Sequence, residues 1–291
     1  MDEGMRMTAD KVVAACRQTD APLAADLPKA AVAAESSTPL LSIRGLSMTF
    51  RGIVALDNVS FDVKARQICG LIGPNGAGKT TLFNCVSRLC QPCAGTIDFA
   101  GEHLLQLPRH RVACLGIGRT FQNLALFQTM SVRDNVLTGG HCRSRGGFVA
   151  NALRIPIVDC EERFLSEHAK DLLEMFELTA IADVPVSAIP FWTRKRVEIA
   201  RALASEPKLL LLDEPAAGLN HADLYELGEL IVSMRDQLGI TILLVEHHMN
   251  LVMRVSDQVV ALDFGRKIAD GTPGEVQKNP DVVRAYLGGE L

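Results

Sequence analysis

Residues 67–81 read QICGLIGPNGAGKTT, and this stretch decides the fold that the sequence predicts. Gln67–Ile72 is short and mostly apolar, which is typical of a buried strand, and it ends in a glycine turn. Lys79 and Thr80 follow the turn, and apolar residues then recur at helical spacing over Thr80–Leu89. A strand, a glycine-rich turn and a helix in this order match the pattern G-x-x-x-x-G-K-[ST] in the structural context that it requires.

Each residue type in this glycine loop (Gly73–Thr81) suits the binding of nucleotide phosphates. Glycines let successive backbone N–H groups converge on phosphate oxygens, and the helix start adds a partial positive charge. Lys79 supplies charge to the β and γ phosphates, and the Thr80 hydroxyl suits Mg²⁺. The alternative is a glycine turn that precedes a helix by chance. The strand, the helix and Lys79 together disfavour this alternative. The residues expected to contact the nucleotide here are Gly73, Asn75, Gly76, Ala77, Gly78, Lys79, Thr80 and Thr81.

Two carboxylates stand at the end of a second apolar strand. Lys208–Leu212 is the strand, with the apolar character expected when helices cover both faces of a parallel sheet, and Asp213 and Glu214 follow it. Acidic residues are rarely buried without a cation or a chemical role. We expect Asp213 to join the Mg²⁺ shell and Glu214 to orient or deprotonate an attacking water. Capping of the next helix is the alternative role for both acids.

Strands and helices alternate along most of the chain, which predicts an α/β fold. Strands are expected at Leu41–Phe50, Val54–Val63 and Thr241–Val245, and a terminal hairpin at 259–268. A helical segment over about residues 126–200 interrupts the alternation, with Pro156 as a breaker inside it. Further helices are expected at Glu161–Leu178, Arg194–Ser205, Leu224–Met234 and after the start signals at Thr272–Glu275 and Asn279–Pro280.

Composition and charge exclude several classes of protein. Of the 291 residues 48% are hydrophobic and 22% are charged, which excludes a disordered or fibrous chain. A net charge of −4 gives no bulk basic field, so we expect no nucleic-acid partner. No apolar run approaches the roughly 18–20 residues of a membrane span. Residues 1–38 show no sustained period and are predicted to be a disordered tail before a domain over 39–288.

The eight cysteines and the start of the chain give an expectation about the compartment. The first residues lack a basic stretch followed by an apolar one, so we expect no signal peptide. Reduced thiols in a cytoplasm are then the default. Cys90 and Cys93 form a lone C-x-x-C pair, and without a second pair we expect no metal site there.

Several ordered motifs resemble those of the ATP-binding cassette (ABC) ATPases, over about residues 40–288. The resemblance implies a RecA-like P-loop NTPase core with an antiparallel β subdomain and the inserted helical subdomain at about 126–200. It also implies ATP and Mg²⁺ as cofactors, with hydrolysis of ATP to ADP and phosphate as the reaction. The motifs are Gly73–Thr81, Arg119-Thr-Phe-Gln122, Leu212-Asp-Glu-Pro215, Ala216-Ala-Gly-Leu-Asn220 and Val245-Glu-His247.

The same resemblance implies roles for individual residues. Gln122 would reach Mg²⁺ and water, His247 would contact the γ-phosphate, and Ala217–Asn220 would cross a dimer interface. Phe50 would stack on adenine, and base–aromatic stacking is worth about 1–3 kcal/mol. A core residue that closes its strand is the alternative for Phe50.

Longer stretches resemble the branched-chain amino acid importer branch of that family, which is called LivG-like. This branch implies an importer of branched-chain or related amino acids with two integral-membrane permease subunits and two different ATPase subunits. A periplasmic substrate-binding protein would act indirectly, and the chain would lie peripherally on the cytoplasmic face of the inner membrane. The stretches are Phe121–Phe127, Ala216–Asn220, Val245–Met249 and Gly271–Gly288.

One motif departs from the family. The signature Leu-Ser-Gly-Gly-Gln is replaced by Ile189-Pro-Phe-Trp-Thr193, which we call the signature turn. In the family this turn faces the γ-phosphate held by the opposite subunit. Pro190 offers neither a hydroxyl nor an N–H, and the indole of Trp192 would fill the phosphate approach unless it turns away, for instance into solvent. We therefore expect Pro190, Trp192 and Thr193 to stand at the contact with the nucleotide, and we expect this contact to be degenerate because of Trp192 and Thr193.

The departure at the signature turn predicts an asymmetric heterodimer with one strong nucleotide site. A homodimer would carry Trp192 at both sites, whereas a different partner would bring an intact signature to the glycine loop of this chain. Two alternatives stay open at this point. One is a nucleotide-binding regulatory subunit with little turnover, and the other is a soluble ABC ATPase outside transport.

Overall fold

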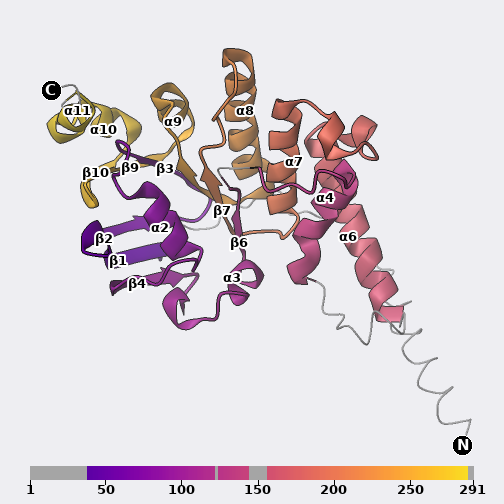
Figure 1. The fold of residues 1–291 in the computed structure, drawn as a ribbon, viewed down its shortest axis with the longest axis horizontal. Coiled ribbons are helices and arrows are strands. Elements are labelled where there is room, and N and C mark those ends of the chain that lie inside the picture. The colour runs from indigo at the N-terminus through magenta and orange to yellow at the C-terminus, as the bar shows by residue number, and fades with distance from the viewer. Residues whose placement is uncertain (1–37, 122–123, 144–155, 288–291) are drawn as a thin grey trace, which may run out of the picture. The chain divides into compact units, whose positions relative to one another are not determined.

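Two β-sheets organise the part of the chain that this computed structural model describes, which is residues 38–121, 124–143 and 156–287. A four-stranded sheet has the order β2-β1-β4-β5, and a six-stranded sheet has the order β10-β9-β3-β8-β7-β6 (Figure 1). The tail expected over 1–38 falls almost wholly outside these residues, and so does Gln122. The strands are β1 Leu41–Phe50, β2 Ile53–Val63, β3 Ile68–Ile72, β4 Ala94–Phe99, β5 Glu102–His103, β6 Ile117–Arg119, β7 Leu209–Asp213, β8 Thr241–Val245, β9 Gln258–Asp263 and β10 Arg266–Gly271.

The helices α2 to α9 lie between strands in sequence, as the predicted α/β alternation requires, and α10 and α11 follow the last strand. Within the described residues none of them is long and apolar enough to cross a membrane. Short 3₁₀ turns occur at Leu104–Gln106, Gly140–Arg143, Thr179–Ile181 and Val186–Ala188. The α-helices are α2 Lys79–Val86, α3 Arg111–Cys114, α4 Val132–Gly139, α6 Pro156–Met175, α7 Phe191–Leu203, α8 His221–Leu238, α9 Met249–Val255, α10 Pro273–Lys278 and α11 Pro280–Leu287.

The centre of the larger sheet is parallel and fully buried. β3 pairs in parallel with β8 and β9, and β7 pairs in parallel with β6 and β8. Every residue of β3, β7 and β8 is buried, as expected for strands covered on both faces. The carboxyl ends of neighbouring parallel strands meet at one edge, which is where open α/β sheets bind ligands. The glycine loop, Asp213–Glu214 and Glu246–His247 follow three of these strand ends.

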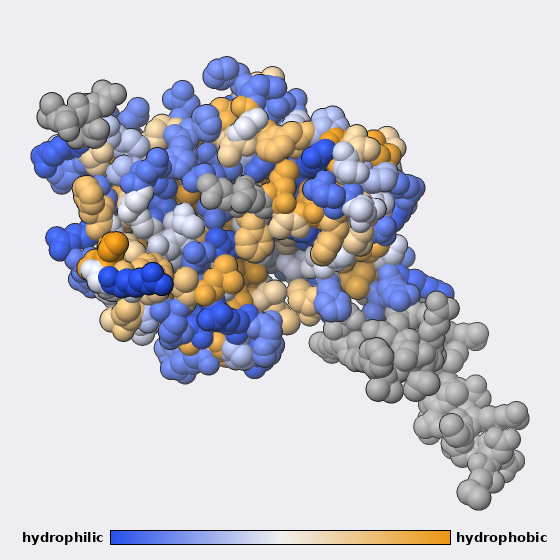
Figure 2. All heavy atoms as spheres, in the orientation of Figure 1, coloured by the Kyte–Doolittle hydropathy of each residue, from blue (hydrophilic) through white to orange (hydrophobic). Residues whose placement is uncertain are grey.

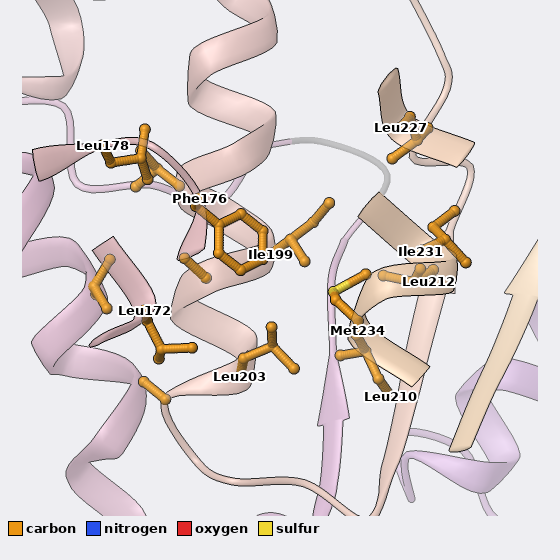
Figure 3. Packing of buried hydrophobic residues seen from close by; sticks show 14 of the residues in the cluster. Leu172, Phe176, Leu178, Ile199, Leu203, Leu210, Leu212, Leu227, Ile231 and Met234 are labelled. Carbon is orange, nitrogen blue, oxygen red and sulfur yellow. The ribbon is translucent and has the colours of Figure 1, made fainter. Parts of the chain in front are cut away.

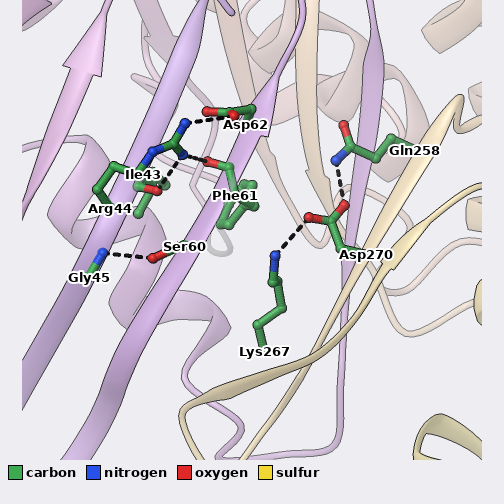
Figure 4. Close-up of polar contacts among 9 residues, drawn as sticks. All are labelled: Ile43, Arg44, Gly45, Ser60, Phe61, Asp62, Gln258, Lys267 and Asp270. Carbon is green, nitrogen blue, oxygen red and sulfur yellow. Dashed lines mark hydrogen bonds and ion pairs between the residues drawn. The ribbon is translucent and has the colours of Figure 1, made fainter.

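The smaller sheet packs on the larger one with α2 between them. Leu82 and Phe83 of α2 are fully buried in one apolar cluster with residues of both sheets, such as Ile43, Leu71 and Leu211. An ion pair between Arg266 and Asp57 also links β10 to β2. Figure 4 shows further polar contacts on the two sheets, namely Arg44 with Asp62, Lys267 with Asp270 and Gln258 with Asp270.

The helices α4, α6 and α7 lie together beside the edge of the larger sheet that β6 forms (Figure 1). Their apolar side chains form a second cluster with β7 and α8, in which Phe176 and Ile199 pack near Leu212 and Met234 (Figure 3). These three helices fall within or across the helical segment expected at about 126–200. The apolar core of this segment is therefore continuous with the apolar side chains that pack on β7.

The expected elements are found, and several of their ends differ from the prediction. α6 begins at Pro156, which was expected to break a helix, because proline is tolerated in a first turn where its missing N–H has no intrahelical partner. α7 begins at Phe191 instead of Arg194, with Pro190 as its N-cap. α2 ends at Val86 instead of Leu89. The capping box predicted at Thr272 and Glu275 is confirmed.

Candidate functional site

The glycine loop leaves β3 and enters α2 with a backbone that only glycine accommodates at its tightest points. Gly78 has φ of +98°, and a Cβ at this position would lie 2.4 Å from the carbonyl oxygen of Ala55. A Cβ at Gly73 would lie 2.2 Å from the carbonyl oxygen of Leu262. Both contacts are shorter than any side chain allows, so the neighbouring backbone fixes glycine at both positions. The loop is thus held from two sides, by β2 and by β9.

Lys79 turns its ammonium group back into the glycine loop. The side chain is buried, and Nζ donates to the carbonyl oxygens of Gly73 at 2.6 Å and Pro74 at 2.9 Å. Burial lowers the pKa of Lys79, while the nearby charges of Glu214 and Asp213 oppose this shift. The positive charge therefore lies where the sequence predicts the β and γ phosphates.

A cleft of about 180 Å³ opens beside the loop. Seven of the eight loop residues named from the sequence line it, Gly73 being the exception, and Glu214 and His247 complete its wall. Thr80 is exposed there, so its hydroxyl is accessible. The lining residues are Ala55, Asn75, Gly76, Ala77, Gly78, Lys79, Thr80, Thr81, Glu214 and His247.

Asp213 is the last residue of β7 and forms a buried ion pair that the sequence did not predict. Its Oδ2 accepts a hydrogen bond from Nη2 of Arg119 at 2.9 Å, and the two side chains are 3% and 10% exposed. Burial raises the pKa of Asp213, and the Arg119 guanidinium opposes that rise. Arg119 thus supplies the cation that a buried carboxylate requires.

Arg119 also ties the end of β6 to the helix that follows the glycine loop. Its Nη1 donates to Asn84 Oδ1 at 2.9 Å and to Ser87 Oγ at 2.8 Å, both on the α2 side. Its guanidinium lies over the rings of Phe83 and Phe121. Arg119 stands in the motif that pointed to Gln122, but only the fold reveals its partners.

Glu214 and His247 are brought together, as the motifs implied. His247 Nε2 lies 2.8 Å from Glu214 Oε1, although 33 residues separate them in the sequence. Glu214 has φ of +49°, an uncommon value for a residue with a side chain, and strain of this kind is found at functional sites. His247 is exposed toward the cleft, so the pair faces the loop across an open space.

Glu246 is a third carboxylate at this edge of the sheet, and no role for it was predicted from the sequence. It is 1% exposed, and its Oε1 accepts a hydrogen bond from the N–H of Ala216 at 2.5 Å. Its Oε2 accepts from the N–H of His247 at 3.1 Å, and burial raises the pKa of Glu246. Glu246 therefore joins the loop after β7 to the loop after β8. The sequence feature that could have identified Glu246 is an acidic residue directly after an apolar strand.

Phe50 stands at the end of β1, where the chain turns into β2. It pairs with Ile53 across the turn and is 43% exposed, so it is not a core residue. Ile53 and Val54 are also exposed at this tip, and Figure 2 shows apolar residues at the surface over β1 and β2. Phe50 does not line the cleft at the glycine loop, and its contact with adenine stays a prediction.

The signature turn leads into α7 and takes no part in the cleft of the same chain. Pro190 is the N-cap of α7 and makes no side-chain capping bond. Trp192 is half-buried and is directed toward α8, where its Nε1 donates to Glu226 Oε2 at 2.9 Å. The indole is therefore directed neither into solvent nor across the helix start. Thr193 is half-buried beside it.

The Thr80 hydroxyl in the cleft and the Asp213 carboxylate at the end of β7 are oxygen donors that fit a magnesium ion bound together with a nucleotide. Mg²⁺ prefers oxygen ligands and is usually held by one or two protein groups plus phosphate oxygens. Thr80 and Asp213 offer a hydroxyl and a carboxylate, and Arg119 already fixes one carboxylate oxygen. Among the described residues no group of three or more His, Cys, Asp or Glu side chains is placed to hold a metal alone. A metal at this edge would need phosphate oxygens to complete its shell.

Comparisons with known proteins agree with this geometry. Residues 56–217 match the family described as ABC transporter, and residues 266–291 match the family described as branched-chain amino acid ATP-binding cassette transporter. The chain is 42% identical over 252 residues to the high-affinity branched-chain amino acid transport ATP-binding protein BraF of Pseudomonas aeruginosa. It is 43% identical over 252 residues to the corresponding protein LivG of Salmonella typhimurium. Each alignment covers 87% of this chain and 99% of the relative.

Solved structures support the same assignment of the fold. An ATP-binding cassette of an ABC transporter in its ADP conformation superposes with a TM-score of 0.75 and 29% sequence identity. The alignment covers 87% of this chain and all of that one. A nucleotide-free ATP-binding cassette matches with a TM-score of 0.74 and 28% identity, over 86% of this chain and 99% of that one.

Proposed function

This chain belongs to the ABC transporter family of ATP-binding cassettes, which hydrolyse ATP, and we propose that it energises an importer of branched-chain or related amino acids. The observation that carries the proposal is the meeting of Lys79, Asp213 and the Glu214–His247 pair at the ends of β3, β7 and β8. These groups supply the charge, the metal ligand and the base that phosphoryl transfer to water requires. The names of the relatives support the class of transported solute.

Binding of ATP begins at the glycine loop in this proposal. The backbone N–H groups of the loop and the helix start hold the phosphates, and the Lys79 ammonium exchanges its two carbonyl partners for phosphate oxygens. Phe50 stacks on the adenine from the exposed end of β1. When bound, Mg²⁺ would neutralise charge on the β and γ phosphates, with Thr80, Gln122 and Asp213 as its protein ligands.

Hydrolysis then depends on the pair at the far wall of the cleft. Glu214 accepts a proton from a water that attacks the γ-phosphorus, the bond to the leaving oxygen breaks, and ADP and phosphate result. His247, at 2.8 Å, holds the Glu214 carboxylate and contacts the γ-phosphate oxygen. Asp213, fixed by Arg119, keeps its carboxylate directed to the metal side of the site.

We further propose that the chain works on the cytoplasmic face of the inner membrane, bound peripherally to two permease subunits. A periplasmic substrate-binding protein would deliver the solute to the permeases and would act on this chain only indirectly. The C-terminal match to branched-chain cassettes supports this arrangement. We propose no nucleic-acid partner, because the net charge is −4.

We propose that the second cassette of the complex is a different chain. Pro190 gives the start of α7 no capping hydroxyl, and positions 192 and 193 lack the glycine and glutamine of the family signature. The proposal does not require a steric block by Trp192, because its indole is directed toward Glu226. The strong site would combine the glycine loop of this chain with the signature of the partner.

The test is ATP hydrolysis and solute uptake by the complex rebuilt in vesicles. The complex contains this chain, a second branched-chain cassette and two permeases, and binding protein loaded with leucine is added. We expect leucine-dependent hydrolysis and uptake, both lost in Glu214→Gln. Hydrolysis without any dependence on leucine-loaded binding protein would refute the solute class. A complex that binds ATP without turnover would support a regulatory subunit instead, and full turnover by this chain alone would refute the different partner.

A further inference from the structure

The start of α7 is attached to its surroundings by a side chain that the family does not have. Trp192 is the single tryptophan of the chain, and it occupies the position of a signature glycine. Its Nε1 donates to Glu226 Oε2 at 2.9 Å, and Glu226 lies on α8, 34 residues later. A glycine here would have no side chain to reach α8.

The contact combines an apolar and a polar part. The indole is half-buried and packs against the apolar cluster that α6, α7, α8 and β7 share. It forms one wall of a groove of about 450 Å³, with Tyr225 and Glu229 on the α8 side. The covered part of the indole makes an apolar contact, and its hydrogen bond to the Glu226 carboxylate lies at the exposed surface, where a bond to an ionised group is still stronger than one between neutral groups.

The other side chains of the first two turns attach α7 in different directions. Phe191 lies against Gly218 in the loop after β7, where an added Cβ would lie 3.2 Å from the ring. Arg194 donates to the carbonyl oxygens of Ile189 and Ser187, both at 2.9 Å. Arg196 donates to the carbonyl oxygen of Phe176 and to Glu177 at the end of α6. Among the described residues of these first two turns, Trp192 makes the polar contact to α8.

We propose that Trp192 and Glu226 are a positioning pair that fixes the start of α7 to α8 and so sets where the signature turn stands. Its effect on turnover rests on the proposed function, in which two cassettes close on shared nucleotides. Both nucleotide sites lie in one interface, so a displaced signature turn in one chain slows closure for the pair. The attachment itself does not depend on nucleotide or partner.

The sole tryptophan makes the attachment directly measurable. In the purified chain without nucleotide, we expect Glu226→Ala to shift the tryptophan emission to longer wavelength, because the indole loses a cover and gains water. Hydrogen exchange of the hydrogen-bonded α7 amides at 194–196 should become about twofold to fivefold faster, the size expected for a solvent-exposed contact to a charged side chain. Glu226→Gln keeps an acceptor oxygen without the charge and should restore both readouts in part. Gln237→Ala, at an exposed position near the end of α8 and outside the lining of this groove, is the control and should change neither.

Turnover of the rebuilt complex tests the positioning role. We expect Glu226→Ala to lower kcat about fivefold to tenfold and to leave KM for ATP within about twofold, because the glycine loop is untouched. Trp192→Phe keeps the ring without the donor and should lower kcat as well. Unchanged emission and exchange in Glu226→Ala would overturn the attachment, and changes in both without loss of kcat would overturn the positioning role. A wild-type complex without turnover would refute the proposed function and the positioning role together, while exchange would still decide the attachment.

Discussion

The buried pair of Arg119 and Asp213 allows the cost of one substitution to be worked out from the structure. The two side chains are 10% and 3% exposed, and their charged atoms lie 2.9 Å apart. Removing one partner of such a pair leaves an uncompensated buried charge, which costs about 3–5 kcal/mol. We therefore expect Arg119→Met, which keeps length without charge, to lower the free energy of unfolding by about 3–5 kcal/mol at neutral pH.

The size of this loss depends on pH in a definite direction. Burial raises the pKa of Asp213 above its ordinary value, and Arg119 opposes the rise, so the pKa is higher still in the variant. A carboxyl whose pKa is raised by folding destabilises the folded state once the pH exceeds its unfolded pKa, and fully above its folded pKa. The deficit of Arg119→Met relative to the wild type is therefore largest when the pH lies above the raised pKa of Asp213. It shrinks as the pH falls through the raised pKa toward the ordinary range of an aspartate.

Urea denaturation followed by circular dichroism measures the loss, in EDTA and without nucleotide. Arg266→Met is the matched control, because Arg266 pairs with Asp57 at 2.7 Å while the two side chains are 73% and 39% exposed. An exposed pair contributes about 0.2–1 kcal/mol, so the control should lose little. Equal losses in the two variants, or a loss for Arg119→Met that does not shrink in acid, would show that burial of Asp213 does not have the cost we assign to it.

Three further changes test the cleft itself. Glu214→Gln should lower kcat for ATP about 10²–10⁴-fold and leave the ATP Kd nearly unchanged, and an unaltered kcat would remove Glu214 as the base. Gly78 and Gly52 both have a left-handed φ, so an alanine at either position destabilises the fold by about 1–2 kcal/mol. A Cβ at Gly78 would in addition strike the Ala55 oxygen at 2.4 Å, so only Gly78→Ala should lose ATP binding in a filter assay; equal loss would contradict this reading of the loop. Lys79→Met should weaken ATP binding, measured by calorimetry, at least about tenfold, and retained affinity would mean that Lys79 does not bind phosphate.

The parts of the site that depend on local sequence could be predicted from it. The glycine loop is a continuous stretch whose strand, turn and helix are encoded by neighbouring residues, and its cleft contains the residues that the motif named. Asp213 and Glu214 follow an apolar strand, and such a strand must lie inside a sheet. The carboxyl ends of parallel strands share an edge, so the convergence of these groups with His247 follows from the class of fold.

The parts that depend on distant partners could not be predicted. The direction of Trp192 is set by Glu226, and the role of Arg119 by Asp213, which lies 94 residues away in the sequence. A sequence pattern gives the chemistry of a side chain but not its rotamer, which tertiary packing decides. The helix start at Pro156 was missed for another reason, because a proline in a first turn and a proline between elements look alike in sequence.

The register of β7 is selected by the polar residues at its end, because its apolar residues cannot distinguish one register from the next. Leu209–Leu212 are four identical residues, all buried, so a slip by one position would exchange leucine for leucine against β6 and β8. The polar end of the strand does not tolerate the slip. In the observed register Asp213 stands beside Val245 and meets Arg119, and the N–H of Glu214 donates to the Val245 oxygen at 2.9 Å. A slipped strand would bury an unpaired charge at the cost assigned above. The residues proposed for catalysis therefore also select the strand register.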